Sequence, residues 1–93
     1  MKFLVLWKLE LSRVSLDVAK AVLSMADYAR PLEESGQVEA RYHIVGAHGG
    51  AWLYNVESND ELEILLARSP VYNVAHYEVL PLAAMAAPPL QQS

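Results

Sequence analysis

Three histidines, His43, His48 and His76, carry the side chains best suited to moving a proton near neutral pH. His76 lies two residues before Glu78, and alternate residues of a strand share one face of a sheet. The Glu78 carboxylate can therefore pair with His76 and raise the basicity of its imidazole. His48 lies within the glycine-rich run GAHGG, and loops often carry functional residues. All three histidines are predicted acid–base groups, although each also fits a hydrogen-bonded surface or interface residue.

Aromatic and charged side chains in the same segments predict a binding site for a flat ligand. The predicted substrate-binding residues are Trp7, Arg41, Trp52, Tyr54 and Glu78. Aromatic walls with a few polar groups suit an unsaturated, oxygenated small molecule. Two other interpretations stay open: the aromatic rings can serve packing alone, and Arg41 and Glu78 can form an ion pair between strands or between subunits.

Several other kinds of site lack the residues that they need. The chain has no cysteine, and its histidines form no HxH or HxxxH pair, so a zinc site is not expected. GAHGG joins two expected strands and lacks the spacing of a phosphate-binding loop. No serine lies in a GxSxG elbow. We therefore expect neither a metal nor a cofactor.

The composition predicts self-association. A chain of 93 residues forms one domain and buries only about 60–65% of its unfolded surface, yet 54% of its residues are hydrophobic. Such an excess of apolar surface is typical of an interface, so a homodimer or a larger homo-oligomer is expected. The net charge is −4, and the seven lysines and arginines are scattered, so nucleic acid is not an expected partner.

The opening MKFLVLW is the only segment that resembles a targeting signal. Lys8 and Glu10 interrupt its apolar run before it reaches the length of an export signal. No segment approaches the roughly 20 apolar residues of a membrane span. A cytoplasmic location without membrane contact is therefore expected.

The spacing of apolar residues predicts the elements that must position these side chains. Ser12 or Ser15 caps a first helix, and Ser58 with Glu61 forms a capping box for a second. The predicted ranges are a strand over 3–9, a helix to about residue 35, strands over 38–45 and 51–56, a helix ended by Pro70, and a strand over 73–82. This βαββαβ order predicts an α+β, ferredoxin-like domain over residues 1–82 with one four-stranded antiparallel sheet. Residues 83–93 are either a loose tail or an arm that packs on a neighbouring subunit.

Finer features of the sequence assign faces to these elements. Both faces of the strand over 3–9 are apolar, which predicts a central strand covered on both sides. In the strand over 38–45, alternation places Arg41 and His43 on the face opposite Val38. Pro31 is expected to kink or shorten the last turn of the first helix.

Residues 36–82 resemble the muconolactone delta-isomerase family. The similarity consists of the spacing of Gly36 and Gly46, an aromatic third strand, NVES entering the short helix, SPVY leaving it, and YEV in the last strand. The resemblance implies a dimeric α+β barrel, in which two four-stranded sheets meet face to face around a ligand cavity. It also implies a proton shift within an unsaturated lactone without metal or cofactor. In such a barrel the sheet face turned away from the helices lines the cavity, so the candidate residues are expected there.

The chain departs from the pattern of the family at two places. The family's acidic base lies on the first helix, where SMADYAR offers only Asp27, and helical spacing turns Asp27 toward water. The polar residues expected after Gly46 are replaced by Ala47, His48, Gly49 and Gly50. These departures count against muconolactone itself as the substrate.

The residues and the resemblance together predict a cofactor-independent enzyme for small molecules. It would move a proton on an unsaturated cyclic or polyketide-like compound, in an isomerisation, a cyclisation or a lyase step. One alternative within the same fold is cofactor-free oxygenation of an aromatic compound. Another is a ligand-binding or assembly protein that keeps the fold and has lost the base.

Overall fold

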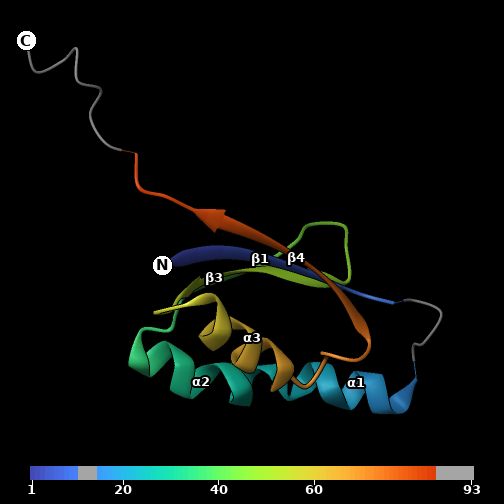
Figure 1. The fold of residues 1–93 in the computed structure, drawn as a ribbon. Coiled ribbons are helices and arrows are strands. Elements are labelled where there is room, and N and C mark those ends of the chain that lie inside the picture. Colours follow the sequence, from blue (N-terminus) through green and yellow to red (C-terminus); the bar gives the residue numbers. More distant parts are fainter. Residues whose placement is uncertain (11–14, 86–93) are drawn as a thin grey trace, which may run out of the picture.

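The computed structural model describes residues 1–10 and 15–85 and contains one sheet and three helices (Figure 1). The elements are β1 (Lys2–Leu9), α1 (Leu16–Leu23), α2 (Met25–Ser35), β2 (Val38–His43), β3 (Gly49–Asn55), α3 (Asn59–Ala67) and β4 (Ala75–Leu82). Two predicted features lie outside the described residues: Ser12 as a helix cap, and most of the C-terminal segment. Within the described residues, no helix is both long and apolar enough to span a membrane.

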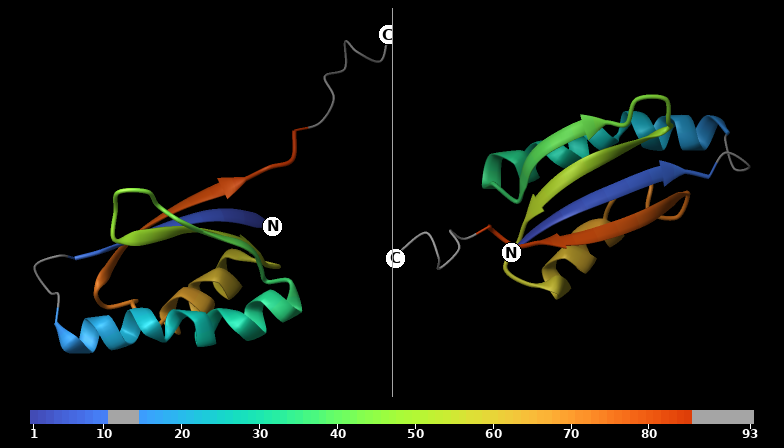
Figure 2. Two further views of the ribbon diagram at one scale, coloured as in Figure 1. Left: turned by 180° about the vertical axis from the view of Figure 1, so that it is seen from behind. Right: turned by 90° about the horizontal axis from the view of Figure 1, so that it is seen from above.

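The sheet has the strand order β2-β3-β1-β4, and all neighbours are antiparallel. The three helices cover one face of the sheet, and no described element covers the other face (Figures 1 and 2). The fold is ferredoxin-like, as predicted, and β1 is a central strand. We call the two sides of the sheet the helix face and the open face.

Local signals in the sequence account for the ends of the helices. The Ser15 hydroxyl accepts the Val18 N–H at 3.3 Å, and the Ser58 hydroxyl accepts the Glu61 N–H at 3.1 Å, as N-cap serines do. Gly36 ends α2 at φ +83°, a left-handed conformation that glycine adopts without strain. Both predicted cap residues that are described, and the predicted end of the first helix, are confirmed.

The first helix is divided at Ser24 rather than kinked at Pro31, where the sequence predicted the irregularity. The Ser24 hydroxyl donates to the Lys20 carbonyl at 3.0 Å, a bond that competes with the backbone ladder and bends helices. Pro31 lies on the exposed side of α2, so the carbonyl that it deprives of a partner faces water. The helix therefore continues through Pro31 to Ser35.

The hydrophobic core lies between the helix face and the helices. Its buried side chains are Phe3, Val5 and Trp7 from β1, Val38 from β2, Trp52 and Tyr54 from β3, Met25, Ala29 and Leu32 from α2, Leu62, Leu65 and Leu66 from α3, and Val56 and Val71 from loops. In the sequence, Val18, Val22, Met25, Ala29 and Leu32 recur at spacings of three and four, which predicts one apolar stripe on the first helix, and three of them belong to this core. The core therefore fixes α2 and α3 against the sheet.

The open face carries the other apolar residues of the strands. The register places there Leu4 and Leu6 of β1, Ala51 and Leu53 of β3, Ala40 and Tyr42 of β2, and Leu80 and Leu82 of β4. Tyr42 is 66% exposed and Leu82 is 45% exposed. One side of β1 is thus buried by helices, while its other side belongs to an uncovered apolar surface.

An irregularity in β2 changes which residues share a face. The register shifts between Val38 and Ala40, so that Val38 pairs with Tyr54 and Arg41 pairs with Trp52. Such a β-bulge inserts one extra residue and restarts the alternation. Val38, Arg41 and His43 therefore all lie on the helix face, and the predicted opposition of Val38 to Arg41 and His43 is wrong.

Candidate functional site

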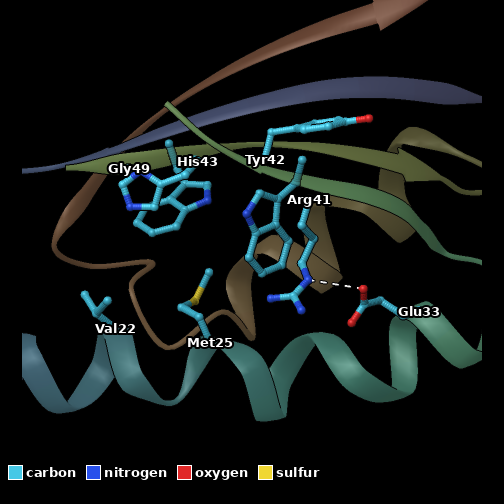
Figure 3. Close-up of a pocket in the computed structure, with 10 residues that line it drawn as sticks. Val22, Met25, Glu33, Arg41, Tyr42, His43 and Gly49 are labelled. Atoms are coloured by element: carbon cyan, nitrogen blue, oxygen red, sulfur yellow. Dashed lines mark ion pairs between the residues drawn. The ribbon is translucent and has the colours of Figure 1, made fainter. Parts of the chain in front are cut away.

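A pocket of about 430 Å³ lies between the helix face of the sheet and the helices α1 and α2 (Figure 3). Its lining residues are Trp7, Arg41, Tyr42, His43, Gly49, Gly50 and Trp52 from the strands, and Val22, Met25 and Glu33 from the helices. Volumes of this size accommodate one small ring compound. The pocket thus lies within one chain, between its two layers, and is open to solvent on one side.

Two tryptophans and a glycine form the deepest part of this pocket. The rings of Trp7 and Trp52 meet edge to face, with centroids 6.3 Å apart and an interplanar angle of 79°. A Cβ atom at Gly50 would lie 2.8 Å from the Nε1 atom of each ring. Both indole nitrogens therefore converge on the same side of Gly50, and only glycine leaves space between them.

Arg41 supplies a positive charge to one side of the pocket. Its Nε forms an ion pair with the Glu33 carboxylate at 3.2 Å, and its guanidinium lies 5.3 Å from the ring centroid of Trp52. In Figure 3 the terminal nitrogens of Arg41 point away from Glu33, toward Met25. A guanidinium has five N–H donors, and Glu33 engages one nitrogen. The terminal nitrogens therefore lie where an anionic ligand group can reach them.

His43 lies at the other side of the pocket, near Gly49 (Figure 3). Its Nδ1 is 3.3 Å from the Ile44 carbonyl oxygen, which can only accept a hydrogen bond. Nδ1 must therefore carry the proton of the neutral ring, and Nε2 keeps its lone pair. This tautomer leaves His43 able to accept a proton from a bound molecule.

The structure divides the predicted site residues between the two faces of the sheet. His43, Arg41, Trp7 and Trp52 line the pocket on the helix face, and Tyr54 lies beside them in the core. Their predicted position on the open face is therefore wrong, because the β-bulge and the helix-facing register of β1 and β3 turn them toward the helices. Four of the eight predicted residues nevertheless line one pocket.

Tyr54 belongs to a buried hydrogen-bonded pair rather than to the pocket lining. The Tyr28 hydroxyl donates to the Leu65 carbonyl at 2.6 Å, so the Tyr54 hydroxyl, 3.2 Å away, donates to Tyr28. Burial, followed by the proximity of Tyr28, raises the pKa of Tyr54 well above its usual value of 10. Tyr28 stacks on Trp52 with centroids 6.1 Å apart, so this pair supports one wall of the pocket from behind.

His76 and Glu78 lie on the open face of β4, as the predicted position requires, and line a hollow of about 130 Å³ with Lys8. His76 forms its ion pair with Glu10, not with Glu78 as predicted. The predicted alternative of an Arg41–Glu78 pair between strands of one chain is also wrong, because β2 and β4 are the two opposite edges of the sheet. Arg41 pairs with Glu33 instead.

His48 lies in the turn between β2 and β3 and does not line the pocket. Its carbonyl accepts the Leu9 N–H at 2.8 Å, which ties the turn to the end of β1. Asp27 is exposed and pairs with Arg30 at 3.1 Å, so its predicted orientation toward water is confirmed. Within residues 1–10 and 15–85, no three potential ligand side chains gather closely enough to hold a metal ion.

Glu33 is the charged residue that the sequence prediction missed. It follows Ala29 by one helical turn, and Ala29 belongs to the predicted apolar stripe. That spacing signals a residue at the margin of the buried side of α2. Gly49 and Gly50 were assigned to a turn, but both lie in β3, where their missing side chains make room for Trp7.

Comparisons with known proteins agree with this architecture. The sequence model of the family described as muconolactone delta-isomerase matches residues 1–87. The muconolactone delta-isomerase of Cupriavidus pinatubonensis is 34% identical over 56 residues, and that of Rhodococcus opacus is 33% identical over 55 residues. These stretches cover 60% and 59% of this chain, and 61% and 59% of the two relatives. The chain thus spans about three fifths of the curated relatives that it matches.

Solved structures show the same fold at low sequence identity. A crystal structure of muconolactone isomerase matches with a TM-score of 0.81 at 19% identity, over 96% of this chain and 95% of that chain. A 5-chloro-2-hydroxyhydroquinone dehydrochlorinase from Burkholderia phenoliruptrix, in complex with 2,5-dihydroxybenzoquinone, matches with a TM-score of 0.73 at 19% identity, over 89% of this chain and 94% of that chain. Because the family's sequence model covers residues 1–87, this chain belongs to the muconolactone delta-isomerase family.

Proposed function

We propose that this protein is a cofactor-independent enzyme that moves a proton on a small, unsaturated ring compound in the pocket between the sheet and the helices α1 and α2. The observation that carries the proposal is the position of His43, the one predicted histidine that lines this pocket, which Arg41 also lines. The reaction is an isomerisation, a cyclisation or a lyase step.

His43 acts as the general base in this proposal. Its Nε2 lone pair accepts a proton from a carbon next to a carbonyl group, while Nδ1 stays bonded to the Ile44 carbonyl. The C–H electron pair becomes a C=C bond while the π pair of the carbonyl moves to its oxygen, which gives an enolate. In an isomerisation, His43 then returns the proton to a different carbon; in a lyase step, the enolate expels a leaving group.

Arg41 holds an acidic group of the substrate and compensates the charge of the enolate. Its pairing with Glu33 and its position over Trp52 restrict the guanidinium to one orientation, so it is ready for the ligand before binding. Val22 and Met25 close the pocket on the helix side and keep it apolar. This role of Arg41 accords with the ligand in the structure of the dehydrochlorinase, 2,5-dihydroxybenzoquinone, a ring with acidic hydroxyl groups.

We further propose that two copies of the chain associate through their open faces. The uncovered apolar residues there, among them Leu4, Leu53 and Leu80, extend across three strands of the sheet. Surfaces of this kind usually mark interfaces. Since the proposed site lies on the opposite face of the sheet, each subunit keeps its own pocket in such a dimer.

The test compares the three predicted acid–base residues in one assay. Loss of the C–H signal in D₂O is followed by NMR for unsaturated lactones, muconolactone included, and for hydroxyquinones. For the compound that exchanges, we expect His43→Gln to reduce the rate by about 10²–10⁴-fold, as the loss of a general base does. His48→Gln and His76→Gln should exchange at the wild-type rate. Full activity of His43→Gln would refute the assignment of the base.

Binding without proton exchange would distinguish the alternative, a ligand-binding protein without catalytic activity, from the proposed enzyme. If a compound binds in the pocket and neither the wild type nor any histidine variant catalyses exchange, the protein binds its ligand without converting it. The same samples therefore decide between the enzyme and the binding protein.

A further inference from the structure

The indole N–H of Trp7 is a buried donor without an acceptor. The side chain is 8% exposed, and its Nε1 finds no hydrogen-bond partner within residues 1–10 and 15–85. Buried polar groups are almost always paired, and leaving one unpaired costs free energy. Trp7 is also a lining residue of the pocket, so its ring borders the space in which a ligand would lie.

The surroundings of this N–H favour an acceptor that comes from a ligand. Nε1 of Trp7 lies on the side of Gly50 on which Nε1 of Trp52 also lies, each 2.8 Å from the position of a Cβ. A side chain at residue 50 would collide with both nitrogens, so only glycine fits beside them. Arg41 and Tyr28 contact the Trp52 ring as well, so both indoles belong to the wall of the pocket.

We propose that Trp7 Nε1–H donates a hydrogen bond to the substrate oxygen that gains negative charge when the proton leaves carbon. This inference rests on the proposed function, in which His43 removes that proton. A donor aimed at an oxygen that becomes an enolate stabilises the transition state more than the ground state. Trp7 is thus a catalytic residue with the role of an oxyanion donor.

The same geometry specifies the class of substrate. Two separate polar features must be matched: a carbonyl oxygen at Trp7, deep between the strands, and an ionised oxygen at Arg41, beside α2. A flat ring that bears a carbonyl and a carboxylate, enolate or phenolate oxygen provides both. A neutral ring of the same shape leaves Arg41 without its ligand and binds more weakly.

The proposal is tested by binding, independently of turnover. The probe is 2,5-dihydroxybenzoquinone, and the matched control is 2,5-dimethoxybenzoquinone, which has the same ring and no ionisable oxygen. The chain contains two tryptophans, so a ¹H–¹⁵N spectrum shows two indole signals, which Trp52→Phe assigns. We expect the Trp7 indole proton to move downfield with the dihydroxy probe, in the wild type and in Trp52→Phe.

Trp7→Phe keeps an aromatic ring, and it removes the donor together with part of the buried ring volume. We expect it to weaken the dihydroxy probe by about ten- to a hundredfold, the range for a hydrogen bond to a charged acceptor. Wild-type affinity of Trp7→Phe refutes the proposal, and so does an unmoved Trp7 indole signal while backbone signals of the pocket shift. Absence of any shift with the dihydroxy probe refutes the proposed substrate class.

The outcomes for Trp7 and for His43 are distinguishable. His43→Gln should retain the downfield Trp7 signal, because the donor does not depend on the base. If His43→Gln retains full exchange activity while the Trp7 signal moves as expected, the proposed base is wrong and the oxyanion donor stands.

Discussion

Replacing single glycines of the turn and of β3 with alanine tests the geometry of the pocket floor. The same methyl group meets three different environments. At Gly50 it would lie 2.8 Å from the indole nitrogens of Trp7 and Trp52, at Gly49 it would overlap the backbone carbonyl oxygen of Trp7, and at Gly46 it would meet nothing within 4 Å. The three variants therefore separate side-chain crowding, backbone overlap and backbone strain.

The magnitudes follow from these environments. Overpacking costs about 1–3 kcal/mol, and the lower entropy of an unfolded alanine chain returns about 0.4–1 kcal/mol, so Gly50→Ala should lose about 1–2 kcal/mol. Gly49→Ala cannot be relieved by a side-chain rotation, because β1 and β3 must separate where Lys8 pairs with Gly49. We expect it to lose more than about 3 kcal/mol, beyond the usual range for a point mutation. Gly46→Ala retains its space but must hold φ near +79°, which costs about 1 kcal/mol.

Urea unfolding and binding of 2,5-dihydroxybenzoquinone are measured on the three variants. The free energy of unfolding should fall least for Gly46→Ala and Gly50→Ala and most for Gly49→Ala. Of the two milder variants, only Gly50→Ala should lose affinity for the probe, because only its methyl group enters the pocket. If Gly50→Ala is as stable as the wild type and binds the probe equally well, the tryptophans do not converge over Gly50, and the described pocket floor is wrong.

Three further outcomes are expected. Tyr28→Phe should lower the free energy of unfolding by about 1–3 kcal/mol, because it leaves the buried Tyr54 hydroxyl without an acceptor. Tyr54→Phe should lower it less, since Tyr28 keeps its hydrogen bond to the Leu65 carbonyl. Equal losses in urea unfolding would refute the donation from Tyr54 to Tyr28. Because burial raises the pKa of Tyr54 in the folded state, the unfolded chain releases that proton first, so stability should fall as the pH rises above about 10. The slope should reach up to about 1.4 kcal/mol per pH unit from this group, and an unchanged slope in Tyr54→Phe would contradict it. Leu53→Glu places a charge on the open face and should convert the proposed dimer to monomers in sedimentation experiments. The control Leu23→Glu, on the exposed side of α1, should leave the dimer intact. A dimeric Leu53→Glu would refute the proposed interface.

The parts of the fold that were predictable are those with local signals. The two-sided apolar pattern of residues 3–9 identified the central strand, and the serine caps identified both helix starts within the described residues. Strand ends moved by about two residues, as boundaries usually do. The break at Ser24 was not predictable from propensity, because proline is the stronger signal and its effect depends on which side of the helix it occupies.

The face on which Arg41 and His43 lie was mispredicted because a single residue was counted as part of the alternation. A strand has a period of two, so one extra residue turns every later side chain to the other face. Glu39 lies at the register shift of β2. Its charged side chain also suits a polar position in a regular alternation, so the local sequence does not identify it as the additional residue of a bulge. The partner strand identifies it, because the Tyr54 and Trp52 positions of β3 fix which residues of β2 lie opposite them.

The same shift explains how one strand serves two surfaces. Upstream of the bulge, Val38 packs into the core, and downstream of it Arg41 and His43 point into the pocket, while Tyr42 points to the open face. If Glu39 were paired like its neighbours in a regular strand, Arg41 and His43 would lie on the surface that we propose for dimer contact, and Tyr42 would face the helices. The bulge therefore keeps the charged and titratable groups out of the proposed interface and places them on the helix face. Deletion of Glu39 closes the bulge without changing the face of any later residue, so ligand binding and association should both persist when titration and sedimentation are measured on one sample; loss of both would contradict the described pairing of β2 with β3.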